Sequence, residues 1–299
     1  TQMIKLIASD MDGTLLDENG VVPEETYDLI IRLKRAGIRF AVASGRRLDT
    51  LCDFFEPIVN DVDYVASNGA QVFVNQKLVD CETFSHAALL RLRSVVDSHR
   101  NLHLAVFDRK MTYLMDNENH FMPELDKNLP NPVRAYELPA PDTGIVKASI
   151  YCDDALMDMA YILERELGGD FVFAPSGEKW IDVMQRGVSK ATGIRQVMSA
   201  YGVAPSEVMA FGDAMNDYEI LRLVGTSVAM ANGRSAIKQI ASKVIGTNAD
   251  HSVQRELEAV LKERERLHSP RPAMTGGMAI RAIREYGQYP GAVYSSIAS

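Results

Sequence analysis

The chain has 299 residues, of which 46% are hydrophobic and 24% charged, a composition typical of a globular protein with a sizeable core. Acidic residues outnumber basic ones by 40 to 32, and the formal net charge of −8 disfavours a nucleic-acid partner. No apolar run approaches the roughly 20 residues of a membrane span, no signal peptide is evident, and Cys52, Cys81 and Cys152 form no CxxC pair. The sequence therefore predicts a soluble, cytoplasmic protein with neither a membrane nor a nucleic-acid partner.

Near the start of the chain, the pattern predicts a strand, a helix and a second strand. Residues 4–8 (IKLIA) are apolar on both faces, as in a buried parallel strand. Residues 23–37 begin with Pro and acidic residues and end with basic residues and Gly, which is typical of a surface helix. With a strand at 40–43, this unit predicts a parallel sheet that carries ligand loops at the carboxyl ends of its strands.

The same alternation returns near the other end of the chain. Short apolar runs predict strands at 207–211, 227–230 and 243–245. Helical patterns cover about 216–224 and 252–266.

The middle of the chain has a different pattern, which predicts an inserted second domain. Helical patterns at 86–98 and 156–167 are surrounded by alternating segments, LHLAVFD, TYLMD, VKASIYC and DFVFAP, which favour a largely antiparallel sheet. We therefore expect a discontinuous core (1–82 and 178–268), an inserted domain (83–177) and a tail (269–299) rich in Gly, Pro, Ser and Ala. The tail is interpreted as having no role in the chemistry; an ordered arm or an oligomer contact are the alternatives.

The most informative motif is DMDGTLL at residues 10–16, directly after the first apolar strand. Unpaired charge at the end of a buried strand costs several kcal/mol, so Asp10 and Asp12 predict a compensating cation. Carboxylates of this kind suit Mg²⁺, which commonly binds one or two of them together with substrate phosphate and water. Gly13 allows a close backbone approach to an anion. The alternative is a simple Asp-rich turn between a strand and a helix.

A second acidic turn, GDAMND at residues 212–217, also follows an apolar strand. A parallel sheet can bring the carboxyl ends of two such strands side by side, and Asp213 would then add a third carboxylate to the cation. Asp217 could bind the cation or orient a basic side chain. The alternative is that Asp213 and Asn216 only cap the following helix.

Two further signals indicate an anion. The SGR turn at residues 44–46 offers a hydroxyl and amide donors between a strand and a helix, a position that favours anions. Lys190 lies one residue inside an expected helix start, where its charge opposes the helix dipole and calls for a compensating anion. For the SGR turn alone, the alternative is an ordinary helix cap. For Lys190 alone, the alternative is a solvated surface lysine.

Together, these signals resemble the four motifs of the haloacid dehalogenase (HAD) superfamily, here DMDGTLL, SGR, the Lys190 region and GDAMND. The resemblance extends over about residues 3–266. Asp10 and Ser44 are 34 positions apart, whereas Ser44 and Lys190 are 146 apart, so a cap domain fits only in the second interval. This arrangement resembles the Cof-type subgroup with a C2B cap (subclass IIB). The implied fold is α/β, a Rossmann-like parallel-sheet core with an inserted α+β cap domain.

The resemblance also implies a mechanism. Asp10 would attack a phosphate monoester as the nucleophile and form an aspartyl-phosphate. Asp12 would protonate the leaving group and then deprotonate the attacking water. Mg²⁺ would be bound by Asp10, the main-chain carbonyl of Asp12 and Asp213. Lys190 would complete the catalytic group.

Other residues of the four motifs are implied to hold the phosphoryl oxygens and stabilise the transition state. These phosphate-binding residues would be Met11, Ser44, Gly45, Lys190 and Asn216. Asp217 and Arg46 would support the site, with Asp217 holding Lys190 or a metal-bound water.

The implied activity is a Mg²⁺-dependent phosphatase of small phosphorylated metabolites, with sugar phosphates as the preferred class. The acid at position 12 favours a phosphatase or phosphomutase over a C–Cl dehalogenase or a P-type ATPase. An FMN or pyridoxal phosphate phosphatase remains open, as does a non-catalytic phosphometabolite-binding protein. Trp180, near the expected return from cap to core, is a candidate contact for the leaving group. The sequence leaves the oligomeric state open.

Overall fold

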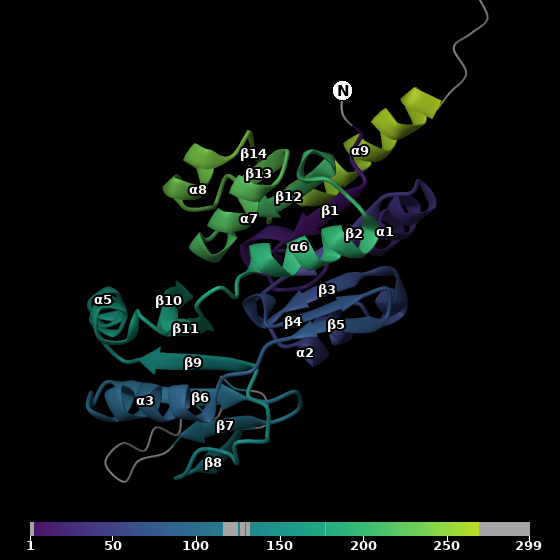
Figure 1. Ribbon diagram of the computed structural model, residues 1–299. Helices are drawn as coiled ribbons and strands as arrows, with labels where there is room; N and C mark the ends of the chain where they lie inside the picture. The colour runs from purple at the N-terminus through teal and green to yellow at the C-terminus, as the bar shows by residue number, and fades with distance from the viewer. Residues whose placement is uncertain (1–2, 116–124, 126–128, 130–131, 177, 269–299) are drawn as a thin grey trace, which may run out of the picture. The chain divides into compact units, whose positions relative to one another are not determined.

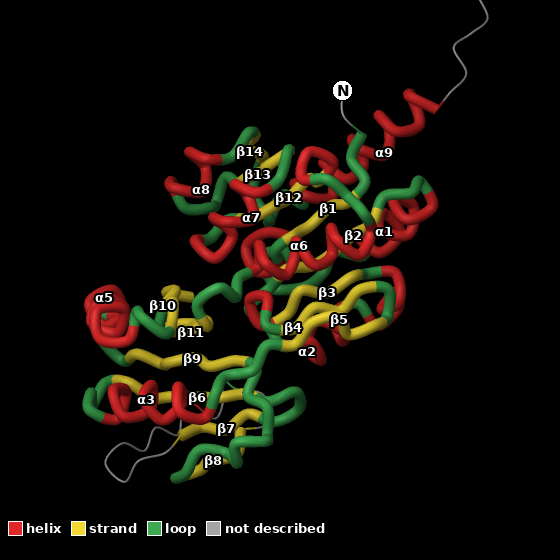
Figure 2. Tube along the Cα trace, in the orientation of Figure 1, coloured by secondary structure: helices red, strands yellow, loops and turns green. Residues whose placement is uncertain are grey.

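A computed structural model describes residues 3–115, 125, 129, 132–176 and 178–268. Within these residues the strands form two sheets, an eight-stranded one that we call the core sheet and a six-stranded one that we call the cap sheet (Figure 2). Residues up to Leu261 make one compact unit that contains both sheets, and the end of the last helix, from Lys262, falls outside it. The predicted tail at 269–299 lies outside the described residues.

The core sheet is built from strands that precede and follow the cap sheet in the sequence: β1 (Leu6–Ser9), β2 (Arg39–Ala43), β3 (Asp63–Ala66), β4 (Gln71–Val74), β5 (Lys77–Cys81), β12 (Val208–Gly212), β13 (Thr226–Met230) and β14 (Lys243–Ile245). Their order is β14-β13-β12-β1-β2-β3-β4-β5. Pairing is parallel from β14 to β3 and antiparallel from β3 to β5. The central strand β1 therefore has β12 on one side and β2 on the other.

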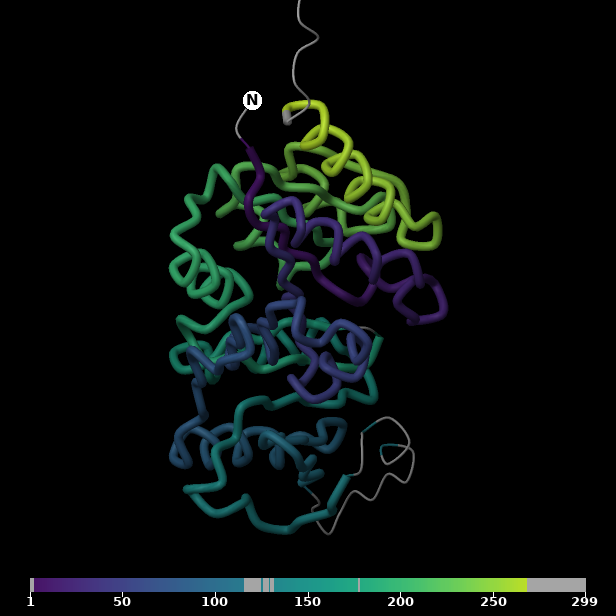
Figure 3. The backbone as a smooth tube through the Cα atoms, turned by 90° about the vertical axis from the view of Figure 1, so that its right-hand side faces the viewer, coloured from purple at the N-terminus to yellow at the C-terminus, as the bar shows by residue number. Residues whose placement is uncertain are grey.

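Helices cover both faces of the core sheet: α1 (Glu25–Arg35), α2 (Leu48–Phe54), α6 (Lys190–Tyr201), α7 (Tyr218–Leu223), α8 (Ser235–Ile240) and α9 (Ser252–His268). Because side chains alternate along a strand, Ile7 packs with α1, α2 and the first part of α9. Its neighbours Leu6 and Ala8 pack with α6, α7 and α8 on the other face. Figure 3 shows α1 and α6 on opposite sides. The central strands β1 and β2 are buried almost throughout, as the apolar runs predict.

Short helical turns follow the strands β1, β3 and β12, at Met11–Leu15, Ser67–Gly69 and Met215–Asp217, and two more follow helices, at Glu56–Asp61 and Pro205–Glu207. The turn at Met215–Asp217 replaces the start of the helix predicted at 216–224, and α7 begins only at Tyr218. The reason is local, since the Asp217 carboxylate accepts hydrogen bonds from the amides of Asp213 and Ala214 and closes a tight turn there.

The cap sheet consists of β6 (Leu102–Phe107), β7 (Thr112–Met115), β8 (Pro132–Ala135), β9 (Lys147–Cys152), β10 (Phe171–Ser176) and β11 (Trp180–Gln185), accompanied by α3 (His86–Asp97) and α5 (Leu156–Leu167). Their order is β10-β11-β9-β6-β7-β8, antiparallel except for the pair β7–β8. α3 and α5 lie next to this sheet (Figure 1), and their apolar side chains pack against one face of it. The cap sheet lies in sequence between β5 and β12.

This architecture confirms the predicted α/β fold, a mainly parallel core with an inserted, largely antiparallel second sheet. The predicted boundary at residue 177 precedes β11, which pairs with β9 and β10. We therefore propose that the inserted domain extends to Gln185. Across the described residues, the helices are too short or too polar to cross a membrane.

Candidate active site

The four predicted motifs meet at the carboxyl edge of the core sheet. Asp10 directly follows β1, Ser44 follows β2 and Asp213 follows β12, and these three strands are neighbours in the sheet. Lys190 is the first residue of α6, where Ser189 caps the helix by accepting a hydrogen bond from the amide of Thr192. Parallel pairing places these strand ends at the same edge.

Lys190 connects two acidic turns inside the protein. Its ammonium donates to Asp10 Oδ1 at 2.5 Å and to Asp217 Oδ1 at 2.7 Å. The Lys190 side chain is fully buried and the carboxylates of Asp10 and Asp217 nearly so. The predicted need for an anion at Lys190 is met by these carboxylates, which together outweigh its charge.

Burial and mutual repulsion shift the acid–base properties of this cluster. Burial, followed by the Asp217 carboxylate, raises the pKa of Asp10 well above its usual range, against the opposite effect of Lys190. Burial and Asp217 likewise raise the pKa of Asp213. Burial alone would lower the pKa of Lys190, but Asp10 and Asp217 raise it above the ordinary value. The lysine therefore stays charged, but its single positive charge does not balance the negative charges of the surrounding carboxylates.

Asp10, Asp213 and Asp217 form a group that could hold a metal ion, since one ligand atom of each lies within 4.8 Å of the others. Thr14 Oγ1 donates to Asp213 Oδ1 at 3.0 Å and orients that carboxylate. Gly13 has φ +76°, and a Cβ atom there would lie 2.6 Å from Asp213 Oδ2. Glycine is thus required both by the turn and by the approach of Asp213.

Asp12 lies outside this carboxylate group. Its side chain is exposed and accepts two hydrogen bonds from Arg46, from Nε at 2.8 Å and from Nη2 at 2.6 Å. These bonds raise the pKa of Arg46. The paired geometry holds the Asp12 carboxylate in one orientation. The contact of its main-chain carbonyl with a metal stays a prediction.

A cavity of about 560 Å³ opens over these residues. It is lined by most of the predicted site, namely Asp10, Asp12, Ser44, Gly45, Arg46, Asp213 and Asn216. The Met11 side chain instead lies in the hydrophobic core, so any part that Met11 plays in phosphate binding falls to its main chain.

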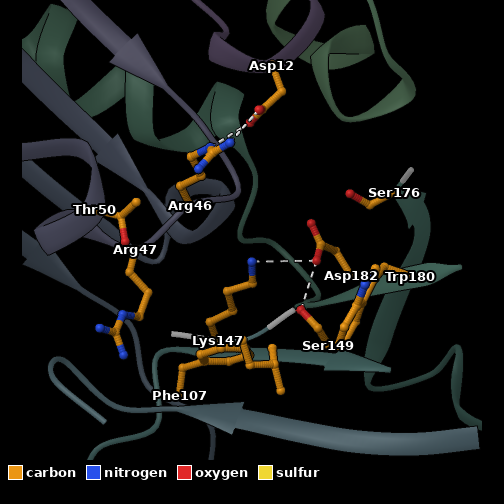
Figure 4. Close-up of a pocket in the computed structure, with 11 residues that line it drawn as sticks. Asp12, Arg46, Arg47, Thr50, Phe107, Lys147, Ser149, Ser176, Trp180 and Asp182 are labelled. Atoms are coloured by element: carbon orange, nitrogen blue, oxygen red, sulfur yellow. Dashed lines mark hydrogen bonds and ion pairs between the residues drawn. The ribbon is translucent and has the colours of Figure 1, made fainter. Parts of the chain in front are cut away.

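A second cavity, of about 450 Å³, extends further over the cap sheet and shares with the first the residues Asp12, Arg46, Lys147, Ser176 and Asp182 (Figure 4). Its cap-sheet wall consists of Phe107, Lys147, Ser149, Ser176, Trp180 and Asp182, with Arg47 and Thr50 from the core and Leu129. Trp180 stands on this wall, at the position considered for a leaving-group contact. Lys147, Ser149 and Asp182 were not identified from the sequence, because they are spread along strands and form no motif.

Sequence analysis also missed several polar residues on the core side. Asn232 donates from Nδ2 to the Gly13 carbonyl at 2.8 Å, and Arg234 donates its amide to the Asp213 carbonyl at 2.9 Å. Asn68, in the turn after β3, donates to Asp182 and accepts from Asn216. Each follows a buried core strand, the same signal that identified Asp10.

Comparisons with known proteins agree with this geometry. The model of the haloacid dehalogenase-like hydrolase family matches residues 7–257. The 5-amino-6-(5-phospho-D-ribitylamino)uracil phosphatase YbjI of Escherichia coli is 30% identical, over 87% of this chain and 97% of the relative. The pyridoxal phosphate phosphatase YbhA of the same organism is 25% identical, over 83% of this chain and 96% of the relative.

Solved structures show the same fold. SMU.1108c from Streptococcus mutans superposes with a TM-score of 0.79 at 23% identity, covering 87% of this chain and 99% of that one. A haloacid dehalogenase-like hydrolase from Bacillus subtilis gives 0.74 at 23% identity, covering 85% and 99%. At this level of identity the likeness concerns the fold.

Proposed function

Because this chain belongs to the haloacid dehalogenase-like hydrolases, in their Cof-type subclass IIB, we propose that it is a Mg²⁺-dependent phosphatase that works through an aspartyl-phosphate. The chain is thus a phosphoric monoester hydrolase that acts on small phosphorylated metabolites. The observation that carries the proposal is the buried contact of Asp10 with Lys190 beside Asp213, on the same cavity as Asp12.

In the first step, an Asp10 carboxylate oxygen attacks the phosphorus and the bond from phosphorus to the leaving-group oxygen breaks. Asp12 gives its proton to that oxygen. In the second step, Asp12 takes a proton from water as the water oxygen attacks the phosphorus, and the bond to Asp10 breaks. Arg46 keeps the ionised Asp12 on the cavity wall.

The donor set fits a hard divalent cation, because three carboxylates face one ammonium in a mostly buried space. Asp10 and Asp213 would hold the ion, with the main-chain carbonyl of Asp12, and Asp217 would keep Lys190 in place. Bound Mg²⁺ would neutralise charge on the phosphoryl group, so that an anionic nucleophile can approach it.

Neutral and cationic donors would hold the phosphoryl oxygens. Ser44 and the Gly45 amide stand at the end of β2, and Asn216 lines the same cavity. Lys190, bound to Asp10, supplies a buried positive charge next to the reacting oxygen. These groups stabilise the charge that develops during transfer. Met11 would contribute through its main chain.

The second cavity is the place for the leaving group. Sugar phosphates remain the substrates that we propose first. Phe107 and Trp180 on its wall favour, as a second candidate, a phosphate ester whose leaving group carries a planar ring. The relatives named for ribitylaminouracil phosphate and pyridoxal phosphate are phosphatases of that second kind.

Release of inorganic phosphate from a panel of sugar phosphates, sugar-alcohol phosphates, pyridoxal phosphate and FMN tests the proposal, with Mg²⁺ and with a chelator. We expect turnover that requires Mg²⁺. Tight binding of a panel member without phosphate release at any Mg²⁺ concentration would instead establish a phosphometabolite-binding protein.

A further inference from the structure

A continuous chain of polar contacts runs from the cap sheet to the phosphate-facing residues of the core. Ser149 on β9 donates to Asp182 Oδ1 on β11 at 2.9 Å. Asp182 Oδ2 accepts from Asn68 Nδ2 at 3.2 Å. The Asn68 Oδ1 atom in turn accepts from Asn216 Nδ2 at 3.2 Å. Asn216 belongs to the proposed phosphate site, so the chain of contacts ends at that site.

Asp182 is held firmly at the cap-sheet end. It lies directly opposite Ser149 in the antiparallel pairing of β11 with β9 and is only 7% exposed. Lys147 Nζ lies 3.7 Å from its Oδ1 and donates to the Gly45 carbonyl at 2.7 Å (Figure 4). A Cβ on Gly45 would be 2.9 Å from Asp182 Oδ2. Glycine at position 45 thus allows the carboxylate to reach over the phosphate loop.

Asn68 is fixed equally well at the core end. It lies in a left-handed turn with φ +55°, followed by Gly69 with φ +105°. Its main-chain N–H donates to the Ser44 carbonyl at 2.9 Å. A Cβ on Gly69 would be 2.1 Å from the carbonyl of Ser189, the residue before Lys190. The Asn68 backbone therefore cannot move without disturbing both loops, and the orientation of its side-chain amide remains the variable element.

The charge of Asp182 determines that orientation. A carboxylate only accepts hydrogen bonds, so Asn68 must turn its NH₂ group toward Asp182 and its carbonyl oxygen toward Asn216. Asn216 must then turn its own NH₂ group toward Asn68. This leaves its second N–H for a phosphoryl oxygen, and its Oδ1 has no hydrogen-bond partner among the described residues.

We propose that Asp182 is a positioning residue of the phosphate site, which acts through Asn68 to orient the amide of Asn216. The proposal rests on the phosphatase function above. Asp182 and Ser149 belong to the cap sheet, whereas Asn68 and Asn216 belong to core loops. The phosphate site is thus complete only when β11 contacts the core, and docking of the cap and assembly of the site are one event.

A double-mutant cycle tests this role: Asp182→Asn, Asn216→Ala and the double variant, each with Mg²⁺. An amide at 182 can present either N–H or oxygen to Asn68, so Asp182→Asn should lower kcat/KM for p-nitrophenyl phosphate by roughly 10-fold or more. In the Asn216→Ala background the same change should cost less than about 3-fold. An equal cost in both backgrounds would overturn the proposal, because Asp182 would then act on the fold or the leaving group.

A charge exchange gives a second test. Asn68→Asp places two carboxylates against each other and should lose more activity than Asp182→Asn. The double variant Asn68→Asp/Asp182→Asn restores a donor facing an acceptor, and should regain about 10-fold over Asn68→Asp alone. No recovery in a double variant that folds like the wild type contradicts the relay, by which we mean the chain of hydrogen bonds from Asp182 through Asn68 to Asn216. Asp170→Asn, an exposed carboxylate of the cap domain, is the matched control.

Binding of inorganic phosphate to each variant, measured calorimetrically with Mg²⁺, separates this proposal from the phosphatase assignment. The relay predicts weaker phosphate binding for Asp182→Asn than for wild type, whether or not the chain turns over p-nitrophenyl phosphate. If the wild type binds phosphate but does not hydrolyse p-nitrophenyl phosphate, only the phosphatase assignment is contradicted. If Asp182→Asn binds phosphate as tightly as the wild type, only the relay is contradicted. Thermal unfolding of each variant confirms that it is folded.

Discussion

The core sheet and the cap sheet present their functional side chains in opposite ways. The central core strands β1, β2 and β12 are buried along almost their whole length, so the polar residues of the site appear where these strands end, as at Asp10, Ser44 and Asp213. The cap sheet is covered by α3 and α5 on one face, and residues in the middle of its strands, such as Ser149 and Asp182, line the cavity. A sheet that is covered on both faces presents its reactive side chains at its edge. A sheet that is covered on one face can present substrate-contacting side chains on the other.

This comparison predicts that changes at the core edge abolish the reaction. Asp10→Asn removes the nucleophile but keeps its shape, and kcat should fall by at least about 10³-fold on every phosphate ester. Rates of phosphate release on several substrates check this. Asp28→Asn, an exposed carboxylate on α1, should behave like the wild type; substantial activity in Asp10→Asn would assign the nucleophile elsewhere.

Removing the buried lysine tests whether the charged cluster at the edge of the core sheet also stabilises the fold. Lys190→Met leaves Asp10 and Asp217 without their cation, which should lower the free energy of unfolding by about 3–5 kcal/mol. Urea unfolding with and without Mg²⁺ measures this, and added Mg²⁺ should return part of the loss.

The pH dependence of that loss follows from the raised pKa of Lys190. A raised folded-state pKa gives stability that is fully present below the unfolded pKa of about 10.4 and is lost only as the pH rises through the folded value. The difference between wild type and Lys190→Met should therefore not shrink from about pH 7 to about pH 9. A loss of the difference within that range would show that Lys190 is not held as a cation.

The acid–base residue should show a smaller effect that depends on the leaving group. Asp12→Ala should slow hydrolysis of alkyl phosphates by about 10²- to 10⁴-fold, because a poor leaving group needs a proton. The loss should be smaller for formation of the aspartyl-phosphate from p-nitrophenyl phosphate, which can be followed as a burst of nitrophenolate. An equal loss on both esters would argue against proton donation by Asp12.

The smallest effect is expected on the cap sheet. Trp180→Ala should raise KM by about 10-fold for an ester with a ring in its leaving group, and much less for a small ester such as glycerol phosphate. Tyr161→Ala is the matched control, since this cap-domain aromatic side chain is 71% exposed. A uniform loss on both esters would mean that Trp180 supports the sheet through Tyr151, which it contacts edge to face.

The core side could be predicted largely because its signals are contiguous. An apolar strand followed at once by DMDGTLL or GDAMND can be recognised without coordinates. The same signal was available after β3, at Asn68, and after β13, at Asn232, and applying it to every strand would have found both. On the cap side, Lys147, Ser149, Trp180 and Asp182 alternate with apolar residues, a pattern that any half-buried strand shows.

By itself, the sequence determined the α/β class, the inserted sheet and the edge where the polar turns gather, because burial on both faces demands continuous apolar runs that any polar group must interrupt at their ends. Only the tertiary structure decided how the members of these turns meet. It placed Asp217 with Asp10 and Asp213, joined Asp12 to Arg46, and brought Asp182 over Gly45. Such pairings depend on distances between segments far apart in the chain, which local patterns do not encode.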